Sequence, residues 1–194
     1  MLLQTLALLS GCNGSDEPGV QASVDTGPDT GDGLPACVDG LPAREFVTAD
    51  ESEALYAVAA DFTVETTTGT WTLSEAWTGC GPILIVQDVP RQASGWPTPL
   101  WERDHDELFE VLPENTTVLF VSTDSSSDER AAILEEMQEQ VEDELESRFS
   151  EAEQEAWMAQ IHYVTESAYQ LEGWVGEVMT DPGWGIGIDR FQRI

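Results

Sequence analysis

Two continuous runs of apolar, strand-forming residues do most to limit how this chain can fold. The first is Pro82-Ile-Leu-Ile-Val86, and the second is Thr116-Thr-Val-Leu-Phe-Val121. Neither run alternates apolar with polar residues along its length, which is typical of strands buried on both faces of a parallel sheet. Parallel neighbours need a crossover connection, usually a helix, so the two runs predict an α/β domain.

Amphipathic segments surround these two runs. Alternation over residues 62–66 and 70–74, around a Thr-Thr-Thr-Gly turn, predicts a β-hairpin ahead of the first run. Leu134, Met137, Val141 and Leu145 recur at helical spacing and predict the longest helix, over residues 128–149. Further helices are expected at 75–77, 100–112, 151–160 and 170–179, a further strand at 161–164, and a last strand and turn over 185–194. The order predicts a central sheet with helices on both faces.

Four local motifs, in order along the chain, resemble the thioredoxin-like fold in the form used by peroxiredoxins and membrane-anchored thiol oxidoreductases. Residues 60–64, Ala-Asp-Phe-Thr-Val, resemble the family's entry strand, which usually reads Pro-Asp-Phe followed by Thr or Ser. Residues 69–77 resemble its Gly-x-x-x-x-Leu-Ser-Asp hairpin, and residues 118–124 resemble a strand that often ends Val-Ser-x-Asp. Residues 186–194 resemble its Phe-x-Ile-Asp-x-x-Gly-Arg-Ile segment.

This resemblance implies a thioredoxin-like central sheet flanked by helices and preceded by a β-hairpin. The family's reactive cysteines lie in the loop after the central strand, where the start of the next helix stabilises a thiolate. Here that loop, residues 88–101, reads DVPRQASGWPTPLW and contains no cysteine. The family also continues into a closing strand and helix beyond the position of Ile194. The resemblance therefore implies the fold without the usual chemistry, and a chain that is truncated or completed by a partner.

The first residues of the chain resemble an export signal. Residues 1–11, MLLQTLALLSG, are mostly apolar and too short to span a bilayer, as in the apolar region of a signal peptide. Leu9-Ser10-Gly11-Cys12 resembles the lipobox of bacterial lipoproteins, in which the cysteine receives a diacylglycerol and becomes the new N-terminus. The resemblance implies lipidation of Cys12 and a location in the bacterial cell envelope, at the outer membrane or cell surface.

The net charge is −31, from 38 acidic residues and seven arginines, and the chain has no lysine. Such a field repels phosphate backbones, so nucleic acid is excluded as a partner. Residues 12–36 are rich in Gly, Pro, Ser and Asp and predict an acidic flexible linker between the signal peptide and a domain over residues 37–194. Other acids crowd residues 128–155, where they are expected to coat helices, although calcium-dependent binding through this surface is an open alternative.

The chain has three cysteines, at positions 12, 37 and 80, which could form a structural disulfide or provide a reactive thiol. If Cys12 is lipidated, Cys37 and Cys80 remain in an oxidising compartment, where such a pair tends to close. A bridge between them would staple the start of the domain to its core. The alternative is a reactive thiol at Cys80, although its neighbours, Thr-Gly before it and Gly-Pro after it, include no base that would lower the thiol pKa.

Aromatic residues supply the remaining candidate site. Trp96, Pro97, Trp101 and Trp174 could together line a groove, although tryptophans are more often core residues or loop anchors. His162 lies within a predicted strand, as a hydrogen-bonded structural histidine does. No metal or cofactor is predicted, since the chain has no Gly-x-Ser-x-Gly, His-Glu-x-x-His or phosphate-loop motif.

Together these features predict a lipid-anchored, exported protein whose thioredoxin-like domain acts in binding or as a scaffold. Its expected partners are the membrane, through the N-terminal lipid, and a protein. The alternative is a thiol-disulfide oxidoreductase that uses Cys37 and Cys80 as an unconventional pair.

Overall fold

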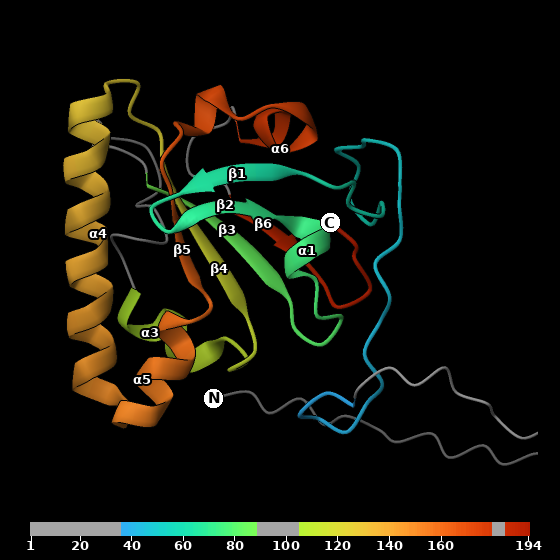
Figure 1. Cartoon of the computed structure of the whole chain (residues 1–194), viewed down its shortest axis with the longest axis horizontal. Helices are drawn as coiled ribbons and strands as arrows, with labels where there is room; N and C mark the ends of the chain where they lie inside the picture. Colours follow the sequence, from blue (N-terminus) through green and yellow to red (C-terminus); the bar gives the residue numbers. More distant parts are fainter. Residues whose placement is uncertain (1–35, 89–104, 180–184) are drawn as a thin grey trace, which may run out of the picture. The chain divides into compact units, whose positions relative to one another are not determined.

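The computed structural model describes residues 36–88, 105–179 and 185–194, and these residues contain one six-stranded sheet (Figure 1). The strands lie in the order β2-β1-β5-β4-β3-β6. The sheet is mixed, and helices pack on both of its faces. The α/β class predicted from the two apolar runs is therefore confirmed.

The middle of the sheet is parallel. Its strands are β3 (Ile83–Asp88), β4 (Thr117–Ser122) and β5 (Ile161–Val164), which contain the two apolar runs and the predicted strand at 161–164. Ile83 is opposite Thr117, and Val118 is opposite Ile161. Val118, Leu119, Phe120 and Val121 all have 0% exposure, so β4 is buried on both faces as the continuous apolar pattern predicted.

Antiparallel strands complete both sides of the sheet. The predicted hairpin is formed by β1 (Thr63–Thr66) and β2 (Gly69–Thr72). It joins the parallel strands through a single ladder pair between β1 and β5, Thr66 opposite Val164. On the other side, β6 (Gly185–Ile188) pairs with β3 and is the outermost strand among the described residues.

Helices cover the two faces unequally. The helices α3 (His105–Val111), α4 (Ser127–Arg148) and α5 (Glu151–Met158) cover one face, where α4 runs along the sheet in Figure 1. The other face is covered by α1 (Leu73–Ala76), the 3-10 turn η1 (Ala168–Gln170) and α6 (Gly173–Val178). Each face has its own hydrophobic cluster, which is the expected result when alternate residues of a buried strand point to opposite sides.

The long helix α4 forms as its sequence predicted. The four apolar residues at helical spacing are at most 5% exposed and face the sheet: Leu134, Met137, Val141 and Leu145. Ser126 caps the helix by accepting a hydrogen bond from the Glu129 amide. The next helix, α5, begins after Ser150, whose backbone amide donates to the Glu153 carboxylate at 2.8 Å.

One expected element differs from the structure. The helix expected at 170–179 begins only at Gly173, as α6, because the chain is extended at Leu171 and Glu172, and Gln170 belongs to η1. The last strand and turn expected over residues 185–194 are both present: β6 ends at Ile188, and the turn after it has a φ of 60° at Gln192. After this turn Arg193 bridges Val58, so the last residues of the chain pair with the segment before β1. The expected helix at 100–112 lies partly outside the described residues.

Candidate functional site

A disulfide joins Cys37 to Cys80, with the two Cα atoms 5.3 Å apart. These are the two cysteines that the sequence analysis paired. Cys37 lies at the start of the described chain and is 7% exposed, whereas Cys80 is half-buried just before β3. The bridge therefore attaches the first segment of the domain to the amino end of the central strand.

Two glycines make the position of Cys80 possible. Gly79 has a φ of +65°, and a Cβ on it would lie 2.0 Å from the carbonyl oxygen of Arg44. A Cβ on Gly81 would lie 1.7 Å from the carbonyl oxygen of Asn115. Because no side chain fits at either position, the backbone on each side of Cys80 can pack directly against a neighbouring segment.

Arg190, which follows β6, places its guanidinium beside the disulfide. Its guanidinium donates to the Asp39 carboxylate at 2.7 Å and to the Pro42 carbonyl oxygen at 3.0 Å, and it lies 3.9 Å from Cys37 Sγ. A guanidinium at this distance would favour a thiolate over a thiol if the disulfide were reduced. Sequence reasoning found no base near Cys80 and missed Arg190, because Arg190 is 153 positions away from Cys37.

A cavity of about 440 Å³ lies beside the disulfide, and both cysteines contribute to its wall. Trp71 of β2 and His162 of β5 line it together and contact each other, with ring centroids 6.2 Å apart. The Trp71 indole Nε1 is buried and has no hydrogen-bond partner in the described part of the chain. Burial lowers the pKa of His162, so this imidazole is neutral at pH 7.

His162 is part of the β4–β5 ladder, opposite Leu119, and its ring packs against Trp71. No side-chain hydrogen bond from this imidazole to another described residue accompanies that contact. The signal for this cavity was the alternation in Thr70-Trp71-Thr72-Leu73, which places Trp71 on the inner face of its strand. That pattern does not reveal that Trp71 contacts His162.

A second cavity, of about 780 Å³, is also lined by Cys80. It shares four lining residues with the first: Val38, Cys80, Asn115 and Gln160. Its wall also contains four charged residues, which are Asp39, Glu114, Asp189 and Arg190. The lining of the second cavity is therefore charged and that of the first is not, although Cys80 lines both.

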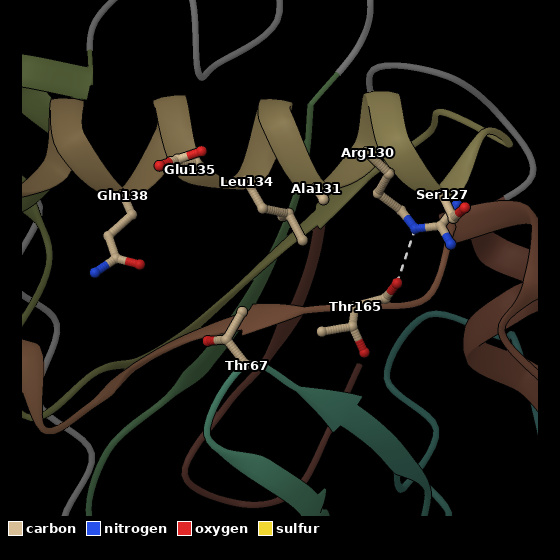
Figure 2. Close-up of a pocket in the computed structure, with 8 residues that line it drawn as sticks. All are labelled: Thr67, Ser127, Arg130, Ala131, Leu134, Glu135, Gln138 and Thr165. Carbon is tan, nitrogen blue, oxygen red and sulfur yellow. Dashed lines mark hydrogen bonds between the residues drawn. The ribbon is translucent and has the colours of Figure 1, made fainter.

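A third cavity, of about 320 Å³, lies between α4 and the end of β5, as Figure 2 shows. Arg130 reaches across it, and its Nε atom donates to the Thr165 carbonyl oxygen at 2.8 Å. The same guanidinium donates to the Asp124 carbonyl oxygen at 2.8 Å. These bonds tie the first turn of α4 to the loops that follow β4 and β5, so we assign Arg130 a structural role.

The aromatic groove expected from the sequence is not formed by Trp174. This residue is 1% exposed, and its Nε1 atom donates to the Ala60 carbonyl oxygen at 3.1 Å. Its ring packs edge-on against Phe62, with centroids 5.6 Å apart. Trp174 is therefore a core residue, and Trp96, Pro97 and Trp101 lie outside the described residues, as does Cys12.

Within residues 36–88, 105–179 and 185–194, no group of three or more His, Cys, Asp or Glu side chains is placed to hold a metal ion. Within these segments no helix combines the length and apolarity needed to cross a bilayer.

Comparisons with protein-family models, curated proteins and solved structures found no match to this chain.

Proposed function

We propose that this chain is a lipid-anchored, exported protein of the bacterial cell envelope, whose thioredoxin-like domain binds a partner without redox catalysis. The proposal joins the lipobox-like Leu9-Ser10-Gly11-Cys12 and the acidic linker to a folded domain that follows them. Three observations on the described residues support its separate parts.

The first supporting observation is a contact between two of the four family motifs. Asp61 of the entry-strand motif accepts hydrogen bonds from the Ser74 amide at 2.9 Å and from the Ser74 hydroxyl at 2.6 Å. Ser74 belongs to the Leu-Ser motif at the end of the hairpin. Asp61 and Ser74 together fix the start of α1. This contact between two of the four motifs supports the proposed thioredoxin-like fold.

The second supporting observation concerns the turn after β6. The family segment Phe-x-Ile-Asp-x-x-Gly-Arg-Ile has a glycine at the position that Gln192 occupies here. Gln192 has a φ of 60°, a conformation that glycine adopts without strain. Asp189, at the Asp position of that segment, accepts hydrogen bonds from the Phe191 amide and the Arg193 amide and closes the turn. This turn supports the proposed resemblance of residues 186–194 to the family segment.

The position of the disulfide is the observation that favours a binding function over redox catalysis. Cys80 lies before Ile83, at the amino end of β3, whereas the reactive loop of the family follows the carboxyl end of this strand. The corresponding loop here, residues 88–101, contains no cysteine in its sequence. Because Cys37 is also buried, we infer that the bridge has a structural role and fixes the first segment of the domain.

A second candidate function, thiol-disulfide exchange, is favoured by Arg190. In that reaction a substrate dithiol would reduce the Cys37–Cys80 bridge to two thiols and would itself be oxidised to a disulfide. The guanidinium 3.9 Å from Cys37 Sγ would stabilise the thiolate released during exchange.

The two candidates are separated by a redox assay on the purified domain. We expect the bridge to resist glutathione buffers that reduce ordinary exchange catalysts, and we expect no acceleration of insulin reduction. A bridge that cycles readily and accelerates insulin reduction would refute the binding proposal and support exchange. An Arg190→Gln variant should change neither result if the bridge is structural.

The anchor is tested by fractionation of bacterial cells that express the full chain. We expect the protein in the membrane fraction and expect Cys12→Ala to move it to the soluble fraction. Ser15→Ala is the matched control, because it changes a neighbouring small residue outside the lipobox-like segment. A Cys12→Ala variant that stays with the membrane would show that the lipobox interpretation is wrong.

A further inference from the structure

We propose that the cavity lined by Trp71, His162 and the disulfide binds a small, uncharged polyol, of about the size of a monosaccharide. This inference rests on the proposed binding function, because it names the class of ligand for one of the cavities beside Cys37 and Cys80. Its volume of about 440 Å³ lies within the range of about 300–1,000 Å³ that small-molecule sites occupy.

The lack of charge around this cavity selects an uncharged ligand. The chain carries 38 acidic residues and seven arginines, yet none of the twelve residues that line the cavity is Asp, Glu or Arg. An anion would be repelled by the net charge of −31 and would find no cation in the wall. A cation would find no carboxylate in the wall to replace its lost hydration. A neutral molecule avoids both costs.

The polar groups in the wall are suited to hydroxyls, which both donate and accept hydrogen bonds. The Trp71 Nε1–H is a buried donor without a partner among the described residues, and neutral His162 can donate from one ring nitrogen and accept at the other. Thr117 and Thr78 contribute hydroxyls to the same wall.

Two amides add acceptors to the wall. The Asn115 side-chain nitrogen donates to the Cys80 carbonyl oxygen at 3.0 Å. The Gln160 side-chain nitrogen donates to the carbonyl oxygens of Glu114 and Ala156, both at 2.9 Å. Because these nitrogens are engaged with the backbone, the amide oxygens are the groups left to accept hydrogen bonds from ligand hydroxyls.

The fold explains why this space is not filled. The hairpin is joined to the parallel strands by the single ladder pair Thr66–Val164, which lies at the end of β5 away from Ile161. Toward the start of β5 no ladder pairs join it to the hairpin, and this is where Trp71 and His162 contact each other. The disulfide then holds Ala36, Cys37 and Val38 over the opening as a further wall.

The experiment follows the Trp71 indole N–H signal in proton–nitrogen NMR spectra of the folded domain, assigned with a Trp71→Phe variant. The probes are D-glucose, D-xylose and myo-inositol, with gluconate and glucosamine as charged analogues of similar size. At low ionic strength we expect at least one neutral probe to shift the signal saturably at millimolar concentration. We expect gluconate to bind at least about tenfold more weakly, since the protein is strongly anionic.

A blocking variant provides a test that leaves the core unchanged. Ala159 is exposed and lines the cavity, so Ala159→Leu should place a larger side chain in the opening and abolish the shift. Ala152→Leu, an equivalent change at an exposed position of α5 outside the cavity, is the matched control and should leave the shift intact. Thermal unfolding of both variants verifies that they fold.

Three results would overturn the inference: no probe in the panel shifts the Trp71 signal, the charged analogues bind as tightly as the neutral ones, or Ala159→Leu binds as well as the control. These failures are distinguishable from failure of the proposed function. Membrane anchoring is measured through Cys12, and redox inertness is measured through the disulfide, without reference to the Trp71 signal.

Discussion

Removing the Cys37–Cys80 bridge is the most informative perturbation of this domain, because it tests whether the disulfide is a structural staple. The variant is Cys37→Ala combined with Cys80→Ala. The two cysteines are separated by 43 positions, and opening a loop of that length increases the chain entropy of the unfolded state. In the chain-entropy model this lowers the free energy of unfolding by about 4 kcal/mol.

The folded state should survive this change, because the first segment is also held by non-covalent contacts. The Arg44 amide donates to the Gly79 carbonyl oxygen at 3.1 Å, and the Trp77 indole donates to the Arg44 carbonyl oxygen at 2.8 Å. Arg190 pairs with Asp39 at 2.7 Å. The loss should therefore come mainly from the unfolded state, and the variant should keep a native fluorescence spectrum.

The assay is urea unfolding followed by tryptophan fluorescence, together with thermal unfolding. For a domain of this size we expect a fall in Tm of roughly 8–16 °C, since each kcal/mol corresponds to about 2–4 °C. Oxidised wild-type protein and a Cys12→Ala variant, which retains the bridge, are the controls. Wild-type protein treated with reductant should unfold at the same urea concentration as the double variant.

Two outcomes would refute this reasoning. A loss of less than about 1 kcal/mol would show that the bridge adds little beyond the contacts that remain. Reduced wild-type protein as stable as the oxidised form would show that the bridge does not limit the unfolded chain, and it would remove the main objection to a redox role.

Three further perturbations test other parts of the structure. Gln192→Leu removes three hydrogen bonds made by a side chain that is 1% exposed. It should lower the free energy of unfolding, measured by urea titration, by about 2–3 kcal/mol. An unchanged urea midpoint would contradict a structural role for this side chain. Gly81→Ala should destabilise the domain by more than about 3 kcal/mol and slow disulfide closure in refolding assays, because its Cβ would collide with the Asn115 carbonyl. Burial lowers the pKa of His162 in the folded state, whereas in the unfolded state this group gains a proton below about pH 6.5. The stability that neutral His162 contributes therefore falls as the pH decreases. His162→Gln should make the urea midpoint fall less between pH 7.5 and pH 5 than it does in the wild type, and an equal fall in both proteins would contradict the prediction.

The elements predicted with success share a physical property. Both apolar runs became strands in the interior of the sheet, and the spacing of Leu134 and Met137 identified the buried face of α4. In each case the residues interact mainly with an apolar surface, and the exact partner matters little. Periodicity is therefore sufficient to identify both the element and its buried side.

The break between η1 and α6 is a failure of the same approach. The segment from 170 to 179 contains apolar residues at helical spacing, yet the chain is extended at Leu171 and turns with a φ of +67° at Gly173. The carbonyl oxygen of Leu171 packs against Gly176, where a Cβ would lie only 1.9 Å away. The spacing of apolar residues does not reveal this local backbone conformation, which the two glycines permit.

The candidate sites were predictable in part. Cysteine arithmetic and an export signal suggested the bridge that the structure contains, because only two cysteines remain once Cys12 is assigned to a lipid. The proximity of Arg190 to Cys37 and of Trp71 to His162 was not predictable, since each pair comes from strands or loops far apart in the chain. The interpretation of Trp174 as a groove residue was wrong, because the same aromatic ring serves equally well in a core.

By itself the sequence determined the α/β class, the burial of the central strands and the overall excess of negative charge, because these depend on local pattern and composition. Only the tertiary structure decided where charge is missing. A wall without charged residues, beside a disulfide and an unpaired indole donor, is formed by residues from the leading segment, β2, β4 and β5. Such a surface is a property of neighbours in space, which the order of residues along the chain specifies only through the complete fold.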